Sequence, residues 1–75
     1  MSPRLPAVTA KELVRFLKRQ GFVEDRQRGS HLVLFLPKDN RVVVVPMHSG
    51  DLGRGLTRHI LKDAGFSIED FLRLR

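Results

Sequence analysis

The sequence predicts an α+β fold in which one helix, three antiparallel strands and a second helix follow in that order, with a short helix at the end. Three observations predict it: a capping box before an amphipathic run, short polar turns between β-branched runs, and a glycine at the end of each of the first two helical patterns. A chain of 75 residues is long enough for one domain, which we expect to span residues 1–75. So short a chain buries only about 60% of its unfolded surface, so its core must be small.

The first helix is predicted from Thr9 to a stop at Gly21. Thr9 and Glu12 have capping-box spacing, and Val8 and Leu13 are placed as a hydrophobic staple. Apolar residues occupy one side of this helix, namely Leu13, Val14, Phe16 and Leu17. The other side carries four cations at helical spacing: Lys11, Arg15, Lys18 and Arg19. This basic row is either a contact surface for phosphate groups or a solvated face.

Strand-like segments follow at residues 22–28, 31–36 and 41–45. The short polar turns between them predict a three-stranded antiparallel sheet. If the first hairpin turns through Gly29 and Ser30 alone, Arg28 lies opposite His31 and Arg26 opposite Val33, all on one face. The other face then presents three leucines to the helices: Leu32, Leu34 and Leu36. A bulge at Gly29 would reverse this assignment.

The region from Pro46 to Gly55 is glycine-rich and is predicted to be a loop. A second helix follows and stops at Gly65, and its apolar face is predicted to consist of Leu56, Ile60, Leu61 and Ala64. A second capping box, Ser67 to Asp70, starts the last helix, with Phe66 placed to staple to Phe71.

Charge and composition narrow the classes of partner. Fourteen Lys and Arg against eight Asp and Glu give a net charge of +6, which favours binding to a nucleic acid. No cysteine is present, so disulfides and thiolate metal sites are excluded, and a cytoplasmic protein is expected. No apolar run approaches the ~20 residues that span a bilayer, so we expect no membrane segment.

The second and third strands are apolar at nearly every position, most plainly from Val42 to Val45. Two helices can cover only one face of a three-stranded sheet. The other face is therefore expected to contact a partner, and we favour another protein over an unusual packing of the tail.

His31 follows two arginines across a short turn, and this combination suits chemistry on a phosphodiester. RNA supplies its own nucleophile, the 2′-hydroxyl, so cleavage needs proton transfer and cations to hold the developing charge. An imidazole, with a reference pKa of ~6.5, can transfer the proton, and guanidinium groups stabilise the charge. We therefore expect His31 to act as general acid or base and Arg28, with Arg26 or a cation of the first helix, to hold the phosphate, without metal or cofactor.

The other polar candidates carry weaker signals. His48 is either an exposed loop histidine or a second functional group that transfers a proton or contacts a phosphate. Ser30 is interpreted mainly as a residue that stabilises its turn. His59 and Asp63 have the spacing of a solvated surface pair. A metal site built from His48, Asp51 and His59 matches no defined ligand motif, so no metal is predicted.

Four segments taken together resemble the HicA toxin family: Gln20 to Phe22, Arg26 to His31, Val45 to Gly50, and Gly55 to Gly65. HicA proteins are mRNA interferases of toxin–antitoxin pairs with a fold like a double-stranded-RNA-binding domain. The resemblance implies that His31 is the catalytic histidine and that a HicB-like antitoxin covers the active face. One departure is the order Gly55-Leu56-Thr57, where the family usually has Gly-Thr-Leu, which removes a capping hydroxyl from position 56.

The predicted function is thus a toxin-like, metal-independent endoribonuclease acting on mRNA. The alternatives are a non-catalytic module that binds double-stranded RNA and a domain that only binds other proteins, and the sequence leaves open whether the chain also forms a homodimer. The residues predicted to contact RNA are Arg26, Arg28, Ser30, Lys11, Arg15, Lys18, Arg19 and His48.

Overall fold

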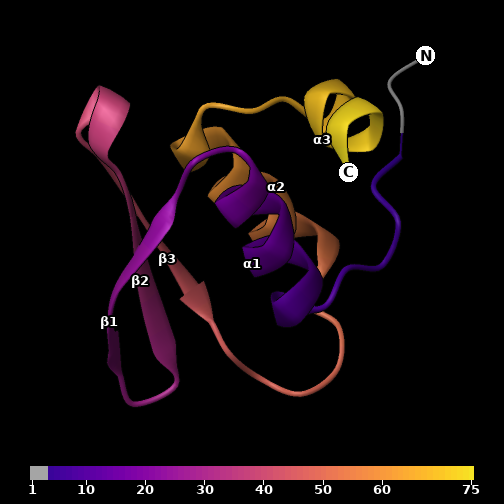
Figure 1. Ribbon diagram of the computed structural model, residues 1–75. Helices are drawn as coiled ribbons and strands as arrows, with labels where there is room; N and C mark the ends of the chain where they lie inside the picture. Colours follow the sequence, from indigo (N-terminus) through magenta and orange to yellow (C-terminus); the bar gives the residue numbers. More distant parts are fainter. Residues whose placement is uncertain (1–3) are drawn as a thin grey trace.

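A three-stranded antiparallel sheet lies on one side of the protein and the helices gather on the other (Figure 1). The computed structural model describes residues 4–75. It confirms the predicted α+β order, with a single 3-10 turn added at Pro37–Asp39. The elements are α1 (Ala10–Arg19), β1 (Val23–Arg28), β2 (His31–Leu36), β3 (Arg41–Pro46), α2 (Arg54–Ala64) and α3 (Ile68–Leu74).

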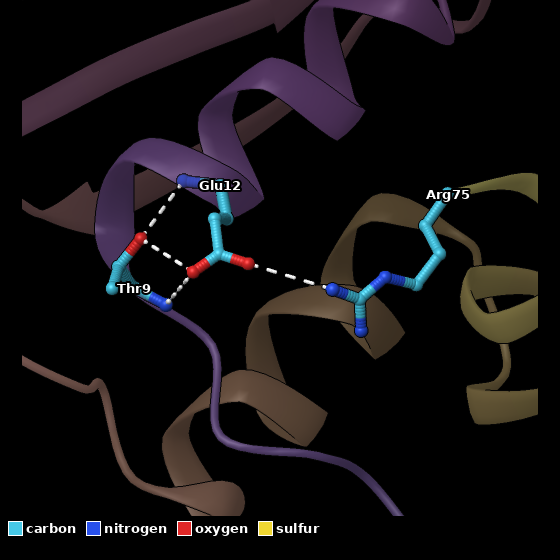
Figure 2. A network of polar contacts seen from close by, with 3 residues as sticks. All are labelled: Thr9, Glu12 and Arg75. Atoms are coloured by element: carbon cyan, nitrogen blue, oxygen red, sulfur yellow. Dashed lines mark hydrogen bonds and ion pairs between the residues drawn. The ribbon is translucent and has the colours of Figure 1, made fainter.

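The capping box predicted for α1 is present. The Thr9 hydroxyl accepts the backbone N–H of Glu12 at 3.2 Å, and Glu12 accepts the backbone N–H of Thr9 at 3.3 Å (Figure 2). The helix ends at Gln20, after which Gly21 takes a positive φ of 107°. These local signals delimit α1 because each satisfies or redirects backbone groups that the helix leaves unpaired.

The strand order is β1-β2-β3, and β2 pairs with both neighbours. The two-residue turn at Gly29 and Ser30 pairs Arg28 with His31 and Arg26 with Val33, which confirms the predicted register. The irregularity in β1 lies at Asp25 and not at Gly29, so the register holds from Arg26 onward. Beyond it, Glu24 faces Leu34.

Strand alternation sends every second side chain of β2 and β3 into the core. Leu32 pairs with Val45 and Leu34 with Val43, and all four are buried against the helices. The predicted apolar side of α1 is buried as well. The core is therefore a single layer between the sheet and the helices.

The face predicted for α2 needs one correction. Leu56 is 40% exposed, whereas Thr57 is 1% exposed and completes the buried face with Ile60, Leu61 and Ala64. These positions follow a 3.6-residue repeat that excludes position 56. The Thr57 hydroxyl donates to the carbonyl of Gly53 at 2.9 Å, so this buried polar group has a hydrogen-bond partner.

The loop predicted from Pro46 to Gly55 is shorter at both ends, because β3 extends to Pro46 and α2 begins at Arg54. Its middle is held by a bridge between Thr9 and Asp51 and by the Leu52 N–H, which donates to the Val8 carbonyl at 2.9 Å. Leu52 is buried. Backbone pairing thus ties this loop to the chain just before α1.

The last helix closes the core through aromatic contacts. Phe66 and Phe71 both pack edge-on against Phe16 of α1, with ring centroids 5.2 and 4.9 Å away. Ser67 and Asp70 form the predicted capping box. The Ser67 backbone N–H, and secondarily its hydroxyl and Arg73, hold the pKa of Asp70 below its usual value.

The lowered pKa of Asp70 predicts a pH-dependent contribution to stability. This contribution is present above the unfolded-state pKa of ~3.9 and is lost as the pH falls through the lower folded-state pKa. We expect the difference in Tm between wild type and Asp70→Asn to be largest at neutral pH and to shrink below about pH 4. Thermal melts from pH 7 down to pH 2 measure it, and a difference that does not change with pH would contradict this account.

Candidate functional site

The face of the sheet turned away from the helices carries the predicted catalytic group. His31 begins β2, directly opposite Arg28 on β1 and Pro46 on β3. Arg26 lies two residues further along β1 on the same face, and all three polar side chains are exposed. Opposed residues of antiparallel strands have Cβ atoms ~5 Å apart, so the imidazole and a guanidinium can act on the same phosphate group.

The rest of this face is apolar. Val42 and Val44 of β3 are 55% and 45% exposed, and Val23 at the far end of β1 is 49% exposed. Val33, between Arg26 and Val44, is buried but does not belong to the main core cluster. We call these valines, together with Phe35, the valine face; His31 and Arg28 lie at one end of it.

The cations of α1 lie on the other side of the sheet. A groove of about 440 Å³ runs between α1 and the first hairpin. Lys11, Arg15 and Lys18 line its helical wall. Gln27 and Leu32, which are paired and point toward the helices, line the other wall. The edge strand β1 therefore separates two basic surfaces, one around His31 and one along α1.

Ion pairs reduce the charge that some of these cations can offer. Lys18 pairs with Glu24, and Arg26 pairs with the neighbouring Asp25 at 2.8 Å. Within residues 4–75, four of the six predicted contact lysines and arginines form no ion pair with a carboxylate: Lys11, Arg15, Arg19 and Arg28. These four are the cations with most charge available for a phosphate.

Ser30 and His48 lie at the same end of the sheet as His31. The Met47 backbone N–H donates to the Ser30 carbonyl at 2.5 Å, which continues the pairing one step beyond His31 and Pro46. His48 follows directly and is exposed. The structure thus places a second histidine next to the turn that precedes the first.

The third histidine is elsewhere. His59 is exposed on α2 and pairs with Asp63 at 3.3 Å, as expected for a solvated pair. Within the described part of the chain, no three His, Asp or Glu side chains form a group that could hold a metal ion.

Sequence reasoning missed Gln27 and Met47, which line the groove opposite the α1 cations. The signal for Gln27 was present, because a two-residue turn places it one position out of phase with Arg26 and Arg28 and so on the helical side. Met47 had no such signal, since its place depends on how far β3 continues.

Residues 10–66 match the family model described as the HicA toxin of bacterial toxin–antitoxin systems. The matched segment is well over half of the chain and contains every predicted site residue. The protein belongs to the HicA toxin family. It is therefore the toxin component of a toxin–antitoxin pair, and an antitoxin is its partner.

No curated protein matches this HicA chain at a significant level. Among the described residues, none of the helices is long and apolar enough to cross a membrane.

The position of His31 opposite Arg28 depends on a tight turn, and a pair of glycine substitutions tests this. Gly29 has a positive φ of 60° and open space where a Cβ would lie. Gly29→Ala should lower the free energy of unfolding by about 1 kcal/mol, because an L-residue is strained in the left-handed region. Gly55→Ala is the control, since Gly55 lies in the first turn of α2 with equally open space.

The control should have the opposite sign, raising stability by up to about 1 kcal/mol because alanine favours the helix. Urea unfolding of the two variants against wild type measures both values. Equal effects of the two substitutions would contradict the role of backbone conformation at Gly29.

Proposed function

We propose that this HicA toxin is an endoribonuclease that cleaves mRNA without a metal ion, with His31 as general acid or base. The observation that carries the proposal is the exposed His31 directly opposite Arg28, which forms no ion pair within residues 4–75, at one end of the valine face. Proteins of this family are generally ribonucleases, which agrees with this chemistry.

The 2′-hydroxyl of the RNA attacks the adjacent phosphorus, and the bond to the 5′-oxygen breaks. The products are a 2′,3′-cyclic phosphate and a 5′-hydroxyl. His31 removes the proton from the 2′-hydroxyl or donates one to the leaving oxygen. Arg28, supported by Arg26, stabilises the negative charge that develops on the phosphate oxygens. His48, exposed at the same end of the sheet, is the candidate for the second proton transfer.

The groove along α1 supports an RNA substrate. Lys11 and Arg15 line it without acidic partners among the described residues, and Gln27 adds an amide on the opposite wall. Cations spaced along a helix bind the phosphate backbone of a strand whatever its sequence. The groove positions the RNA, whereas the residues around His31 act on it.

The valine face supports a protein partner for the same region. Exposed valines next to Arg28 and His31 offer apolar area beside positive charge. A HicB-like antitoxin that buries Val42 and Val44 would lie over His31 and exclude RNA from it. Inhibition of the toxin then follows from covering the catalytic group.

Cleavage of a labelled single-stranded RNA in EDTA tests the catalytic assignment. His31→Ala should reduce the rate by about 100-fold or more, as expected for loss of a proton-transfer group. His59→Ala is the matched control, because His59 is an exposed histidine paired with Asp63 on another element. Circular dichroism of wild type and the two variants is the control that all three share one fold.

Equal cleavage by wild type and His31→Ala would show that another group, or a contaminant, carries the activity. Binding of RNA without cleavage by either protein would favour the non-catalytic RNA-binding module, which the α1 groove also supports.

The partner surface gives a separate prediction. Val44→Glu should weaken binding of the HicB-like antitoxin by about tenfold or more, because a charge would be buried against an apolar surface. Leu74→Glu is the control, since Leu74 is also partly exposed but lies on α3. Isothermal titration with the antitoxin compares them; equal affinities would place the interface elsewhere.

A further inference from the structure

A second hollow lies between α1 and α3, apart from His31 and from the groove along the first hairpin. Its volume is about 150 Å³. Three arginines and one glutamate surround a floor of two phenylalanine rings. The lining residues are Glu12, Arg15, Phe16, Arg19, Phe71 and Arg75.

We propose that this hollow, which we call the α1–α3 subsite, binds a backbone phosphate of the RNA substrate some distance from the cleaved bond. The proposal rests on the proposed function, because it takes RNA as the ligand. It adds a contact that depends on α3 and that neither the catalytic assignment nor the groove along β1 requires.

The charge of the hollow favours an anion. Three guanidinium groups face one carboxylate, and the carboxylate of Glu12 already accepts several hydrogen bonds (Figure 2). One oxygen accepts the Thr9 N–H at 3.3 Å and the Thr9 hydroxyl at 3.0 Å, and the other accepts Arg75 at 3.4 Å. Arg15 and Arg19 have no carboxylate partner among the described residues, so their N–H donors are available to a phosphate.

Arg75 is held in place before any ligand binds. Its guanidinium lies 5.0 Å from the centre of the Phe71 ring, and Phe71 is buried edge-on against Phe16. Its contact with Glu12 restrains it from the other side. A side chain that is already ordered loses less conformational entropy when it binds a phosphate.

The α1–α3 subsite adjoins the basic groove, because Arg15 lines both. Lys11, Arg15 and Arg19 follow at intervals of four residues and so form one row along α1. This row covers about 12 Å of helix, which allows contact with more than one phosphate. A strand that lies in the groove can therefore continue across α1 to α3.

The family match ends at residue 66, so Phe71 and Arg75 lie beyond it. They nevertheless belong to the structure around α1, through the buried Phe71 ring and the pair between Arg75 and Glu12. The contribution of α3 to RNA binding is thus a property that this chain adds to the matched segment.

The test measures RNA binding in the His31→Ala background, so that cleavage does not interfere. Single-stranded RNAs of about 4 to 16 nucleotides cover the usual range of site sizes. Arg19→Gln and Arg75→Gln are each compared with Arg73→Gln, which removes the same charge from α3 but does not line the hollow. Thermal melts verify that all the variants fold.

We expect Arg19→Gln and Arg75→Gln to weaken binding of the longest RNAs by about three- to tenfold and to reduce the salt slope by about 0.7, the value for one lost phosphate contact on a single strand. The shortest RNAs should bind all the variants equally, since they cannot occupy both the groove and the hollow. Arg73→Gln should match the parent protein.

The proposal is overturned if Arg19→Gln and Arg75→Gln bind every RNA as Arg73→Gln does. Failure of the subsite can be told from failure of the proposed function by also measuring cleavage. If His31→Ala abolishes cleavage while Arg19→Gln and Arg75→Gln leave RNA binding unchanged, only the subsite is rejected. If the arginine variants weaken binding of long RNAs as expected but the wild-type protein does not cleave RNA, only the proposed nuclease activity is rejected.

Discussion

The pairing register of β2 is the constraint on which the rest of the structure depends. β2 is the central strand and is apolar at every position after His31, so its composition does not say which face is buried. The two-residue turn at Gly29 and Ser30 sets the register on one side, and pairing with β3 carries it across the sheet. A slip of one residue would turn Leu32 and Leu34 outward and His31 into the core.

Helices cover one face of this sheet, and among the described residues the valines of the other face stay exposed, apart from Val33 (Figure 1). The uncovered face therefore keeps valines that a larger domain would bury, next to a histidine and an arginine. Burial of each exposed valine by a partner is worth up to about 1.5 kcal/mol. One geometric fact thus leaves accessible both the proposed catalytic group and the surface through which we propose that an antitoxin blocks it.

The edge strand β1 determines on which side of the sheet its charged side chains lie. Beyond the irregularity at Asp25, Glu24 turns toward α1 and pairs with Lys18, while Arg26 and Arg28 turn to the face of His31. The charged side chains along β1 also protect an exposed edge from pairing with another chain. Positive charge consequently lies on both sides of this strand, so the function we propose requires RNA bound along α1 to pass around this edge to reach His31.

Much of the fold could be predicted because its signals act over short stretches of chain. The capping boxes at Thr9 and Ser67 satisfy backbone groups three residues away, and the Gly29 turn pairs residues that are nearly adjacent. The same short range predicted that His31 and Arg28 share a face. These features depend on residues close together in the chain, so spacing predicted the capping boxes directly and predicted the shared face once a two-residue turn was assumed.

The sequence by itself therefore determined the element order and, on condition of a two-residue turn at Gly29 and Ser30, predicted the hairpin register and the open-face position of His31 that the structure shows. Only the tertiary structure decided that Thr57 rather than Leu56 is buried and that the α1 cations lie across β1 from His31. It alone brought Arg75 to Glu12, 63 positions apart in the chain. These outcomes depend on how the helices pack against the sheet and against one another. Such packing brings together residues that are far apart in the chain, and no local sequence pattern predicts those contacts.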